Sequence, residues 1–426
     1  MEDLDVIIVG TGAAGLFCAL HLPTDKKILI VTKNAVDKSN SFLAQGGICV
    51  LKNEKDYNSY FEDTMKAGHY ENNKDSVELM IRKSPEIISE LISYGVNFEN
   101  KNGKYQYTRE GGHAVPRILF HKDLTGKEIT GKLFEEVKKR ENIKISEYTT
   151  MLDIVCNGNT CTGIVICNKD GEVERVDAKY VVFACGGIGG LYESSTNFHH
   201  ITGDAIAISL KHNIELENIN YIQIHPTTLY SEKPGRRFLI SESVRGEGAV
   251  LYNKNMERFV NELLPRDLLT KEIKKQMKKD GTKFVWLSMK DIGVDVIKKH
   301  FPNIYQRCLE EGYDVTKECI PVTPAQHYHM GGIKVNLDSK TSMERLYAVG
   351  EASCNGIHGK NRLASNSLLE SLVFAKCAAF DIIKNFAPYE GAKPAVNLDD
   401  YKDSEKLKSS YKEMILNEIE RINNCE

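Results

Sequence analysis

The sequence contains no long apolar run, and this absence argues against a membrane-spanning helix. Its purely apolar stretches are short, such as residues 181–185, whereas a bilayer requires about 20 consecutive apolar residues. The N-terminal residues 1–5 are acidic, unlike the basic start and apolar core of a secretory signal. We therefore expect no membrane partner and a soluble, cytoplasmic protein.

Paired cysteines and an excess of one charge are also missing. The 11 cysteines include no Cys-x-x-Cys pair and are odd in number, so we expect reduced thiols and no metal site. Cys156, Cys161 and Cys167 lie close together, on an expected strand–turn–strand unit that favours packing over metal binding. The 56 basic and 59 acidic residues give a formal charge of −3, which offers no electrostatic case for nucleic acid.

What is present first is a glycine-rich loop between a strand and a helix. Residues 5–9 form a buried-strand pattern, residues 10–15 read Gly-Thr-Gly-Ala-Ala-Gly, and residues 16–20 have helical spacing before a second strand at 27–32. This order is the context of a dinucleotide-binding fingerprint, in which helix N–H groups face a pyrophosphate. The acidic residue expected after the second strand is replaced by Lys33, so a nicotinamide cofactor is less expected.

The distribution of proline suggests an inserted domain. Six of the 11 prolines lie between about residues 225 and 325, a region that also holds a helical stretch at 267–279. The strand–glycine pattern returns at 346–351. We expect an α/β fold: a Rossmann-like domain (1–220 and 331–390) interrupted by an α+β capping domain (221–330), followed by a short helical segment (391–426). The active site should lie at the junction of the two domains.

Several segments combine glycine, histidine, arginine and carboxylate in ways that packing alone does not explain. They comprise residues 41–47, 109–117, 223–227, 241–248, 265–267, 327–332 and 358–370. Arginine suits bidentate binding of carboxylates. Arg245, Arg266 and Arg362, with two histidines, therefore indicate an anionic substrate that carries two carboxylates.

Through these segments, from about residue 4 to about 380, the sequence resembles the flavoprotein subunits of fumarate reductase and succinate dehydrogenase and, most closely, the L-aspartate oxidase family. The resemblance implies bound FAD. It is expected to be non-covalent, because Asn40 stands where the membrane-bound enzymes carry a flavin-linking histidine. The implied FAD contacts are Gly10, Thr11, Gly12, Ala13, Ala14, Gly15, Lys33, Asn40, Ser41, Phe42, Leu43, Ala44, Gln45, Gly46, Gly47, Thr149, Thr150, Asp204, Glu351, Ser367 and Leu368.

The resemblance also assigns the substrate side of the site. It implies substrate binding by Gln223, His225, Ser241, His327, Tyr328 and Arg362, and catalytic roles for Arg266, Glu110 and Arg245. Glu110 favours aspartate over succinate, because without a substrate ammonium it would be an unpaired anion beside a dianion. The proton acceptor stays open between Arg266, the family's proton-transfer arginine, and Glu110, since a guanidinium is a poor base.

The implied reaction is oxidation of L-aspartate to iminoaspartate, with oxygen or fumarate as electron acceptor. This oxidation would be the first step of de novo NAD biosynthesis, and quinolinate synthase would use its product. Two alternatives remain: a soluble fumarate reductase, which shares these arginines and histidines, and a flavin-binding scaffold without activity. The scaffold is disfavoured because it would not need a dicarboxylate site, whereas the sequence contains Glu110, Arg266, His327 and Arg362 together.

The C-terminus departs from the family pattern. Typical L-aspartate oxidases continue into a helical bundle, whereas here one helix-like stretch follows, with Tyr411, Ile415, Ile419 and Ile422 at helical spacing. We expect this shortened end to affect stability and partner contacts more than chemistry, because all the site residues lie upstream of it.

Overall fold

The computed structural model describes residues 4–392 and 394–425, so most of the acidic N-terminal stretch, residues 1–3, lies outside the described part. Its central element is a parallel sheet of order β7-β2-β1-β10-β17. The strands are β1 (Leu4–Val9), β2 (Ile28–Val31), β7 (Ile143–Ser146), β10 (Val173–Phe183) and β17 (Leu346–Ala348). β10 is long enough to join a second, antiparallel layer with β9 (Thr160–Cys167) and β8 (Thr150–Asn157).

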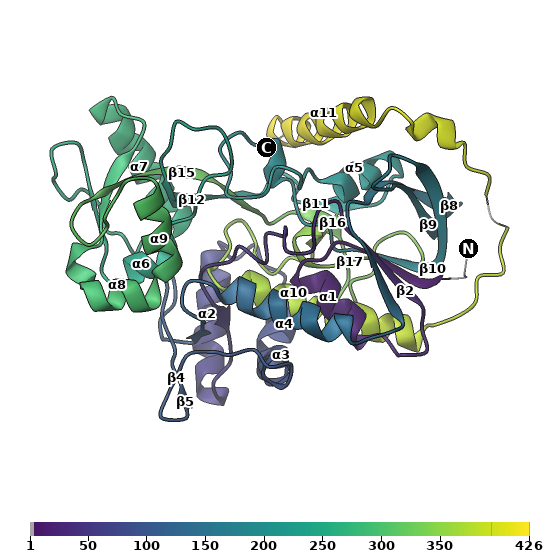
Figure 1. Ribbon diagram of the computed structural model, residues 1–426, viewed down its shortest axis with the longest axis horizontal. Helices are drawn as coiled ribbons and strands as arrows, with labels where there is room; N and C mark the ends of the chain where they lie inside the picture. Colours follow the sequence, from purple (N-terminus) through teal and green to yellow (C-terminus); the bar gives the residue numbers. More distant parts are fainter. Residues whose placement is uncertain (1–3, 393, 426) are drawn as a thin grey trace.

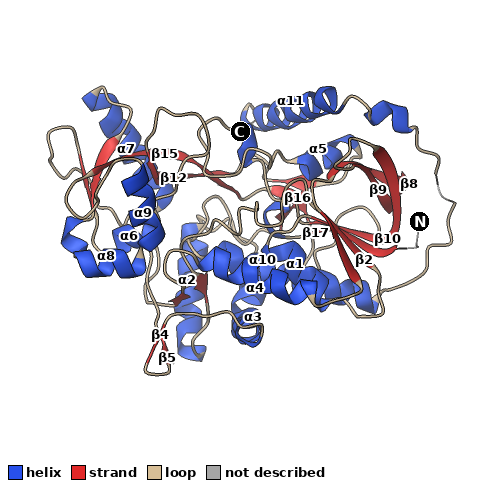
Figure 2. Ribbon diagram, in the orientation of Figure 1, coloured by secondary structure: helices blue, strands red, loops and turns tan. Residues whose placement is uncertain are grey.

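Helices cover both faces of the parallel sheet because its strands are apolar on both sides. In β1, Val6 and Ile8 pack into one hydrophobic cluster, and the alternating residues Ile7 and Val9 pack into the other. Figure 2 shows α1 (Ala13–His21), α4 (Thr125–Lys138) and α10 (Asn366–Lys384) on one side, and α5 (Asp204–Lys211) and α11 (Ser404–Asn423) on the other. Beyond the first layer lie α2 (Tyr57–Ala67) and α3 (Lys74–Ser93).

A separate antiparallel sheet of order β12-β15-β14-β13 forms the other half of the molecule, on the left of Figure 1. Its elements are β12 (Ile222–Leu229), α6 (Glu242–Gly246), β13 (Val250–Tyr252), α7 (Arg266–Asp280), β14 (Val285–Ser288), α8 (Val294–His300), α9 (Pro302–Glu310) and β15 (Ile320–His329). It has its own hydrophobic cluster, from Leu229 to Val322. The expected α/β fold with an inserted α+β cap is confirmed, and we retain 221–330 as the proposed bounds of the cap.

Short elements complete the described chain. They are the strands β3 (Ile48–Cys49), β4 (Asn100–Lys101), β5 (Lys104–Tyr105), β6 (Ile118–Leu119), β11 (Leu216–Glu217), β16 (Gly332–Lys334) and β18 (Ser353–Cys354), and the 3-10 turns at 54–56, 189–191, 290–292, 350–352 and 398–401. No helix of the described part is both long and apolar enough to span a membrane.

The predicted C-terminal helix is present as α11. We call the half built on the parallel sheet the flavin half, after the cofactor expected there. Residues Tyr411, Ile415 and Ile419 of α11 are buried against its second hydrophobic cluster, and the Tyr411 hydroxyl donates a 2.7 Å hydrogen bond to the Leu152 carbonyl. In Figure 1 this helix, in yellow, lies above α5. The helical spacing seen in the sequence therefore marks the face that packs.

Two contacts tie the cap to the rest of the molecule away from the site. Asp123 accepts hydrogen bonds from the backbone N–H groups of Asn303 (3.2 Å) and Ile304 (2.7 Å), at the start of α9. His69, after α2, lies 3.2 Å from Asp267 of α7. These contacts hold the cap against the flavin half and so fix the wall of the cavity between them.

Candidate active site

A large cavity runs from the carboxyl edge of the parallel sheet to the cap. Val9, Val31, Ala184 and Val349, which end or directly follow β1, β2, β10 and β17, all line it. It encloses about 1610 Å³ of space free of atoms, part of it open to solvent. Ligands of open α/β sheets bind at this edge, beyond the carboxyl ends of the parallel strands.

One end of the cavity is shaped by backbone. Gly10 has φ of +117°, and a Cβ atom there would lie 2.2 Å from the Ala184 carbonyl oxygen. A Cβ on Gly15 would lie 2.1 Å from the Gly10 oxygen, so this glycine permits close packing of helix on strand. α1 begins after Gly12 without a side-chain cap and without acidic residues in its first turn. Its free N–H groups therefore suit a pyrophosphate.

Polar groups continue along the same end. The Lys33 ammonium lies 2.5 Å from the Asp204 carboxylate and donates to the His200 carbonyl (2.9 Å) and the Thr202 hydroxyl (3.0 Å). The buried Gln45 side-chain oxygen has no hydrogen-bond partner among the described residues, although it lines the cavity. A glycine cradle, a free helix N-terminus and an unsatisfied amide fit the pyrophosphate and polar groups of FAD.

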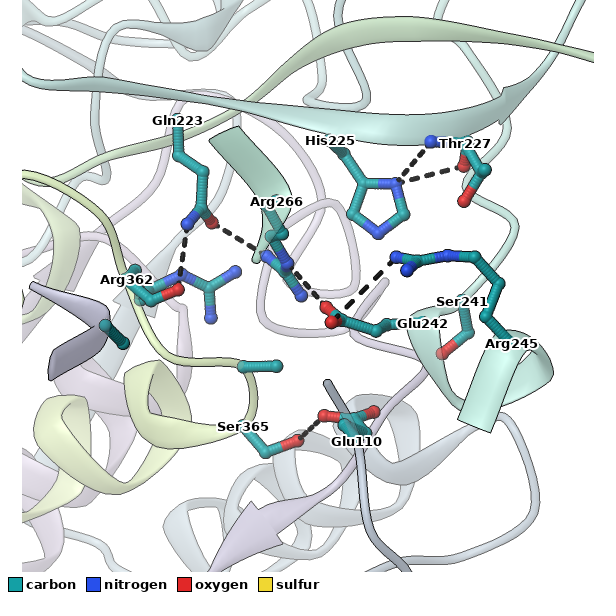
Figure 3. Close-up of polar contacts among 12 residues, drawn as sticks. Glu110, Gln223, His225, Thr227, Ser241, Glu242, Arg245, Arg266, Arg362 and Ser365 are labelled. Carbon is teal, nitrogen blue, oxygen red and sulfur yellow. Dashed lines mark hydrogen bonds and ion pairs between the residues drawn. The ribbon is translucent and has the colours of Figure 1, made fainter. Parts of the chain in front are cut away.

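The other end of the cavity is charged and buried, with Arg266 at its centre (Figure 3). Arg266, the first residue of α7, donates from Nη1 to Gln223 Oε1 and from Nε to Glu242 Oε2, both at 2.7 Å. Burial alone would raise the pKa of Glu242, but the charges of Arg266 and Arg245 hold that pKa below its ordinary value. Glu242 is therefore an anion at neutral pH.

Arg245 lies behind this pair and does not line the cavity. Its Nη2 is 3.9 Å from Glu242 Oε1, and its Nη1 donates to the Glu262 carbonyl. Burial lowers the pKa of the Arg245 guanidinium. Arg266, Glu242 and Arg245 thus lie in a row from the cavity into the cap, with a hydrogen bond between the first two and 3.9 Å between the last two.

Arg362 enters from the flavin half. Its Nη1 donates to Ser367 Oγ at 2.7 Å, its guanidinium lies 4.5 Å from the Tyr328 ring centre, and its backbone carbonyl accepts from Gln223 Nε2 at 2.8 Å. Burial, followed by repulsion from Arg266, lowers the pKa of Arg362 to about 10. Because this pKa is still well above neutral pH, Arg362 keeps its positive charge there.

His225 and His327 both line the cavity and contact each other edge to face, with ring centres 5.2 Å apart. Burial, followed by the positive charge of Arg266, holds the pKa of each well below its ordinary value. His327 Nδ1 is 2.8 Å from the Thr196 hydroxyl, and the buried Nε2 of His225 has no partner among the described residues. Both rings are neutral and offer hydrogen bonds rather than charge.

Glu110 lies between the two ends of the cavity. Its oxygens accept 2.6 Å hydrogen bonds from Ser243 of the cap and Ser365 of the flavin half. Burial, and then repulsion from Glu242, raises the pKa of Glu110. A Cβ on Gly46 would lie 2.8 Å from Glu110 Oε1, so the carboxylate touches the segment predicted to follow the flavin.

Comparison with known proteins identifies the family. A family model described as an FAD binding domain matches residues 5–368. L-aspartate oxidase of Clostridium perfringens is 53% identical over 379 residues, which cover 89% of this chain and 86% of that protein. L-aspartate oxidase of Clostridium acetobutylicum is 46% identical over 420 residues, covering 98% and 96%. The chain belongs to the L-aspartate oxidase family of FAD-binding proteins.

Solved structures agree with this family. A quinol–fumarate reductase of E. coli superimposes with a TM-score of 0.86 at 28% identity, covering 96% of this chain and 74% of that chain. A second quinol–fumarate reductase structure gives a TM-score of 0.87 at 29% identity, covering 97% and 76%. This member of the L-aspartate oxidase family, whose cofactor is FAD, therefore shares its fold with the fumarate reductases.

In this L-aspartate oxidase family chain, the structure brings most of the predicted site residues to one cavity. Glu110, His225, Ser241, Arg266, His327, Tyr328 and Arg362 line the substrate end, and the lining of the cofactor end comprises Gly10, Thr11, Gly12, Ala14, Lys33, Asn40, Ser41, Leu43, Ala44, Gln45, Gly46, Gly47, Thr149, Asp204, Glu351, Ser367 and Leu368.

Six predicted residues do not line the cavity: Ala13, Gly15, Phe42, Thr150, Gln223 and Arg245. Ala13 and Gly15 are buried where α1 packs on the sheet. Thr150 is flanked by the lining residues Thr149 and Met151, as expected where neighbouring side chains alternate in direction. Gln223 and Arg245 lie behind the lining side chains: Gln223 contacts Arg266, and Arg245 contacts Glu242. We therefore propose supporting roles for Ala13, Gly15, Thr150, Gln223 and Arg245.

Sequence reasoning missed Glu242, Ser243, Thr196 and Arg236. Glu242 and Ser243 lie within the segment 241–248, where an acid three residues before Arg245 was a usable signal. Thr196 contacts His327, and Arg236 lines the cavity from a loop of the cap. Neither stands in a motif, so only the fold could reveal them.

Proposed function

We propose that the protein catalyses the FAD-dependent oxidation of L-aspartate to iminoaspartate. The observation that carries this proposal is the position of Glu110, a buried carboxylate that lines the same cavity as Arg266, Arg362 and two neutral histidines. Aspartate carries two carboxylates and one ammonium, and this site offers cations for the first and an anion for the second. The identities to L-aspartate oxidases support the same substrate.

The charges at the substrate end would orient the substrate. Arg266 comes from the cap and Arg362 from the flavin half, so two carboxylates of one molecule can bridge the halves. Each guanidinium offers several donors in a fixed plane, and the neutral histidines add hydrogen bonds. Fixing both carboxylates directs the C2–H bond toward the cofactor end, which is catalysis by orientation. Bound FAD supplies the acceptor for the electrons.

The substrate amine must lose a proton during oxidation. Glu110 is the stronger candidate acceptor, because burial raises the pKa of its carboxyl and thereby makes the carboxylate a better base. The guanidinium of Arg266 is a poor base, but its contact with Glu242 gives a path along which a proton can leave the cavity. We propose Glu110 as acceptor and the chain of Arg266, Glu242 and Arg245 as the exit path.

Further proposals concern the wider reaction. Oxygen or fumarate would serve as electron acceptor, and quinolinate synthase would use the product in NAD biosynthesis. Non-covalent FAD follows from Asn40, whose amide offers no nucleophile for a flavin link. A cytoplasmic location is consistent with all eleven cysteines being free.

Anaerobic mixing of the purified FAD-loaded protein with L-aspartate tests the reaction. We expect the flavin absorbance to bleach with L-aspartate and to persist with succinate. Bleaching by succinate alone would favour the alternative, a fumarate reductase. Heat denaturation in the same preparation should release the FAD into the supernatant, and yellow colour retained by the precipitate would contradict the non-covalent link.

A further inference from the structure

A cysteine, a histidine and an aspartate meet outside the cavity, where β8 packs on α5. Cys156 Sγ lies 3.5 Å from His212 Nδ1, and His212 Nε2 lies 2.7 Å from Asp153 Oδ1. Asp153 is 1% exposed, and its second oxygen accepts from the Tyr401 hydroxyl (2.7 Å) and the Lys211 ammonium (2.5 Å). The Asp153 carboxylate therefore fixes the imidazole of His212 so that its Nδ1 atom is directed at the Cys156 thiol. The same order of carboxylate, base and nucleophile occurs in sites with an activated nucleophile.

A second thiol faces Cys156 across the strand pair. Cys156 of β8 is the register partner of Cys161 in β9, next to the pair of Asn157 and Thr160 that closes the hairpin. The Cys161 N–H donates to the Glu344 carbonyl instead of to β8, which marks a non-hydrogen-bonded pair. In such pairs the Cα atoms lie about 4.5 Å apart, within the range of about 4.4–6.8 Å that a disulfide spans.

The two side chains also point to the same side of the sheet. Cys161 belongs to the buried cluster that includes Ile154 and Ile164, and Cys156 packs partly buried against that same cluster. Cys167, on the same hairpin, packs against a different cluster with Leu152 and Val165. Only Cys156 and Cys161 of these three thus share a face.

We propose that Cys156 and Cys161 form a peroxide-reactive dithiol, with Cys156 as the attacking thiol, His212 as its base and Cys161 as the resolving thiol. The oxidant is hydrogen peroxide, which forms when an amino acid is oxidised with oxygen as electron acceptor. The source of peroxide in the cell therefore rests on the proposed function with oxygen as acceptor. The site itself is independent of the active site, because none of Asp153, Cys156, Cys161 and His212 lines the cavity.

The chemistry balances in two steps. The Cys156 sulfur attacks one peroxide oxygen while His212 accepts the thiol proton, and the O–O bond breaks to give the sulfenic acid and hydroxide, which takes that proton and leaves as water. The Cys161 sulfur then attacks the Cys156 sulfur, the S–O bond breaks, and a second water leaves. Two thiols lose two electrons in total, and one peroxide is reduced to two waters.

The base is necessary because the thiol alone is weakly acidic. Burial, and then the charge of Asp153, raises the pKa of Cys156, while Lys211 acts in the opposite direction. A positioned imidazole removes this obstacle by accepting the proton during the attack. Cys167 is also partly buried, but its thiol contacts the Asn168 carbonyl and no histidine of the described residues is hydrogen-bonded to it, which makes it the matched comparison within one hairpin.

The test treats the FAD-loaded protein, without substrate, with hydrogen peroxide. Residues 145–169 contain no internal lysine or arginine, so one tryptic peptide carries all three cysteines and differential alkylation can compare them directly. We expect Cys156 and Cys161 to be lost together as a disulfide, and His212→Gln to slow this loss by about 100-fold, the lower end of the effect of a positioned base. Cys161→Ser should leave Cys156 as a sulfenic acid that dimedone labels.

The controls separate reactivity from folding. Cys167→Ser should not change the rate, and FAD content and melting temperature should show that His212→Gln is folded. Loss of Cys156 no faster than loss of Cys167, or an unchanged rate in folded His212→Gln, would overturn the proposal. If added peroxide forms the disulfide but L-aspartate with oxygen does not, the result supports the peroxide-reactive dithiol and contradicts the use of oxygen as electron acceptor.

Discussion

The two ends of the cavity differ in the groups that they offer to a ligand. The cofactor end is formed by backbone, with glycines at 10 and 12 and the free N-terminus of α1. The substrate end is formed by buried charges, with Arg266 and Glu242 in contact and Arg362 close by. The first end has few ionised groups, chiefly Lys33 paired with Asp204.

This difference predicts two kinds of sensitivity. At the cofactor end a substitution acts through shape, since an added atom meets backbone that cannot move. At the substrate end a substitution acts through charge and hydrogen bonding, since an unpaired buried ion is costly. The following variants test the contrast, beginning with the largest expected effect.

Gly10→Ala should abolish the FAD-loaded protein. The new Cβ would lie 2.2 Å from the Ala184 oxygen, and φ is +117°, where L-residues are strained. We expect the free energy of unfolding to fall by about 3 kcal/mol or more. Gly131→Ala in α4 is the matched control, because nothing lies within 4 Å of its Cβ and alanine should be neutral or stabilising there. Thermal melting and bound FAD would measure both, and equal behaviour would contradict the role of backbone shape.

Arg266→Lys keeps the charge but loses the planar fork that reaches Gln223 and Glu242 together. We expect kcat/KM for L-aspartate to fall by about 10²–10³-fold, as for loss of one pre-positioned donor. Arg307 of α9 pairs with exposed Glu310 and with Glu311 and does not line the cavity, so Arg307→Lys should keep full activity. A loss below about 3-fold in Arg266→Lys would show that charge alone suffices at this position.

Glu110→Gln should reduce aspartate oxidation far more than fumarate reduction, which involves no amine. Loss of a charge-assisted contact of roughly 1.5–3 kcal/mol corresponds to about a 10- to 150-fold effect. Glutamine is similar in shape and can keep contacts with Ser243 and Ser365, so the fold should survive. Rates with the two substrates, measured on the same preparation, give the comparison. Equal losses would assign Glu110 to support of the fold or the flavin.

Of these variants, Glu370→Gln should have the smallest effect on activity, and its main effect should be on how stability depends on pH. Glu370 is buried behind Tyr328, beside Asn355, Ser371, Glu351 and the neutral His358, and burial raises its pKa to about 7. Because the folded pKa exceeds the unfolded one, the protonated form stabilises the fold at low pH, and this stability is lost as the pH rises through about 7.

The wild type should therefore lose stability relative to Glu370→Gln between pH 5 and pH 8, by up to about 3 kcal/mol. Melting temperatures of both proteins across this range measure the difference. Glu405→Gln on the exposed face of α11 is the control and should show no such trend. A constant difference between wild type and Glu370→Gln would mean that Glu370 does not titrate in this range.

The local order of the sequence determined the cofactor end. The apolar run at 5–9, the glycines of residues 10–15 and the second strand are contiguous, and the structure reproduces them as β1, the loop with α1, and β2. Short-range periodicity and glycine requirements are properties of neighbouring residues, so one chain is sufficient to detect them. The helices at 266–280 and 404–423 followed from the same kind of signal.

Only the tertiary structure decided how the charges of the substrate end pair. Glu110 meets Ser243 and Ser365, which are 133 and 255 residues away in the chain, and Glu242 meets Arg266 across 24 residues. The same holds for Cys156 and His212, which are 56 residues apart. The sequence supplied arginines, histidines and carboxylates of the right kind. The pairing of Glu242 with Arg266 depends on how the cap folds, and the contacts of Glu110 depend on how the two domains pack together. No local pattern encodes either contact.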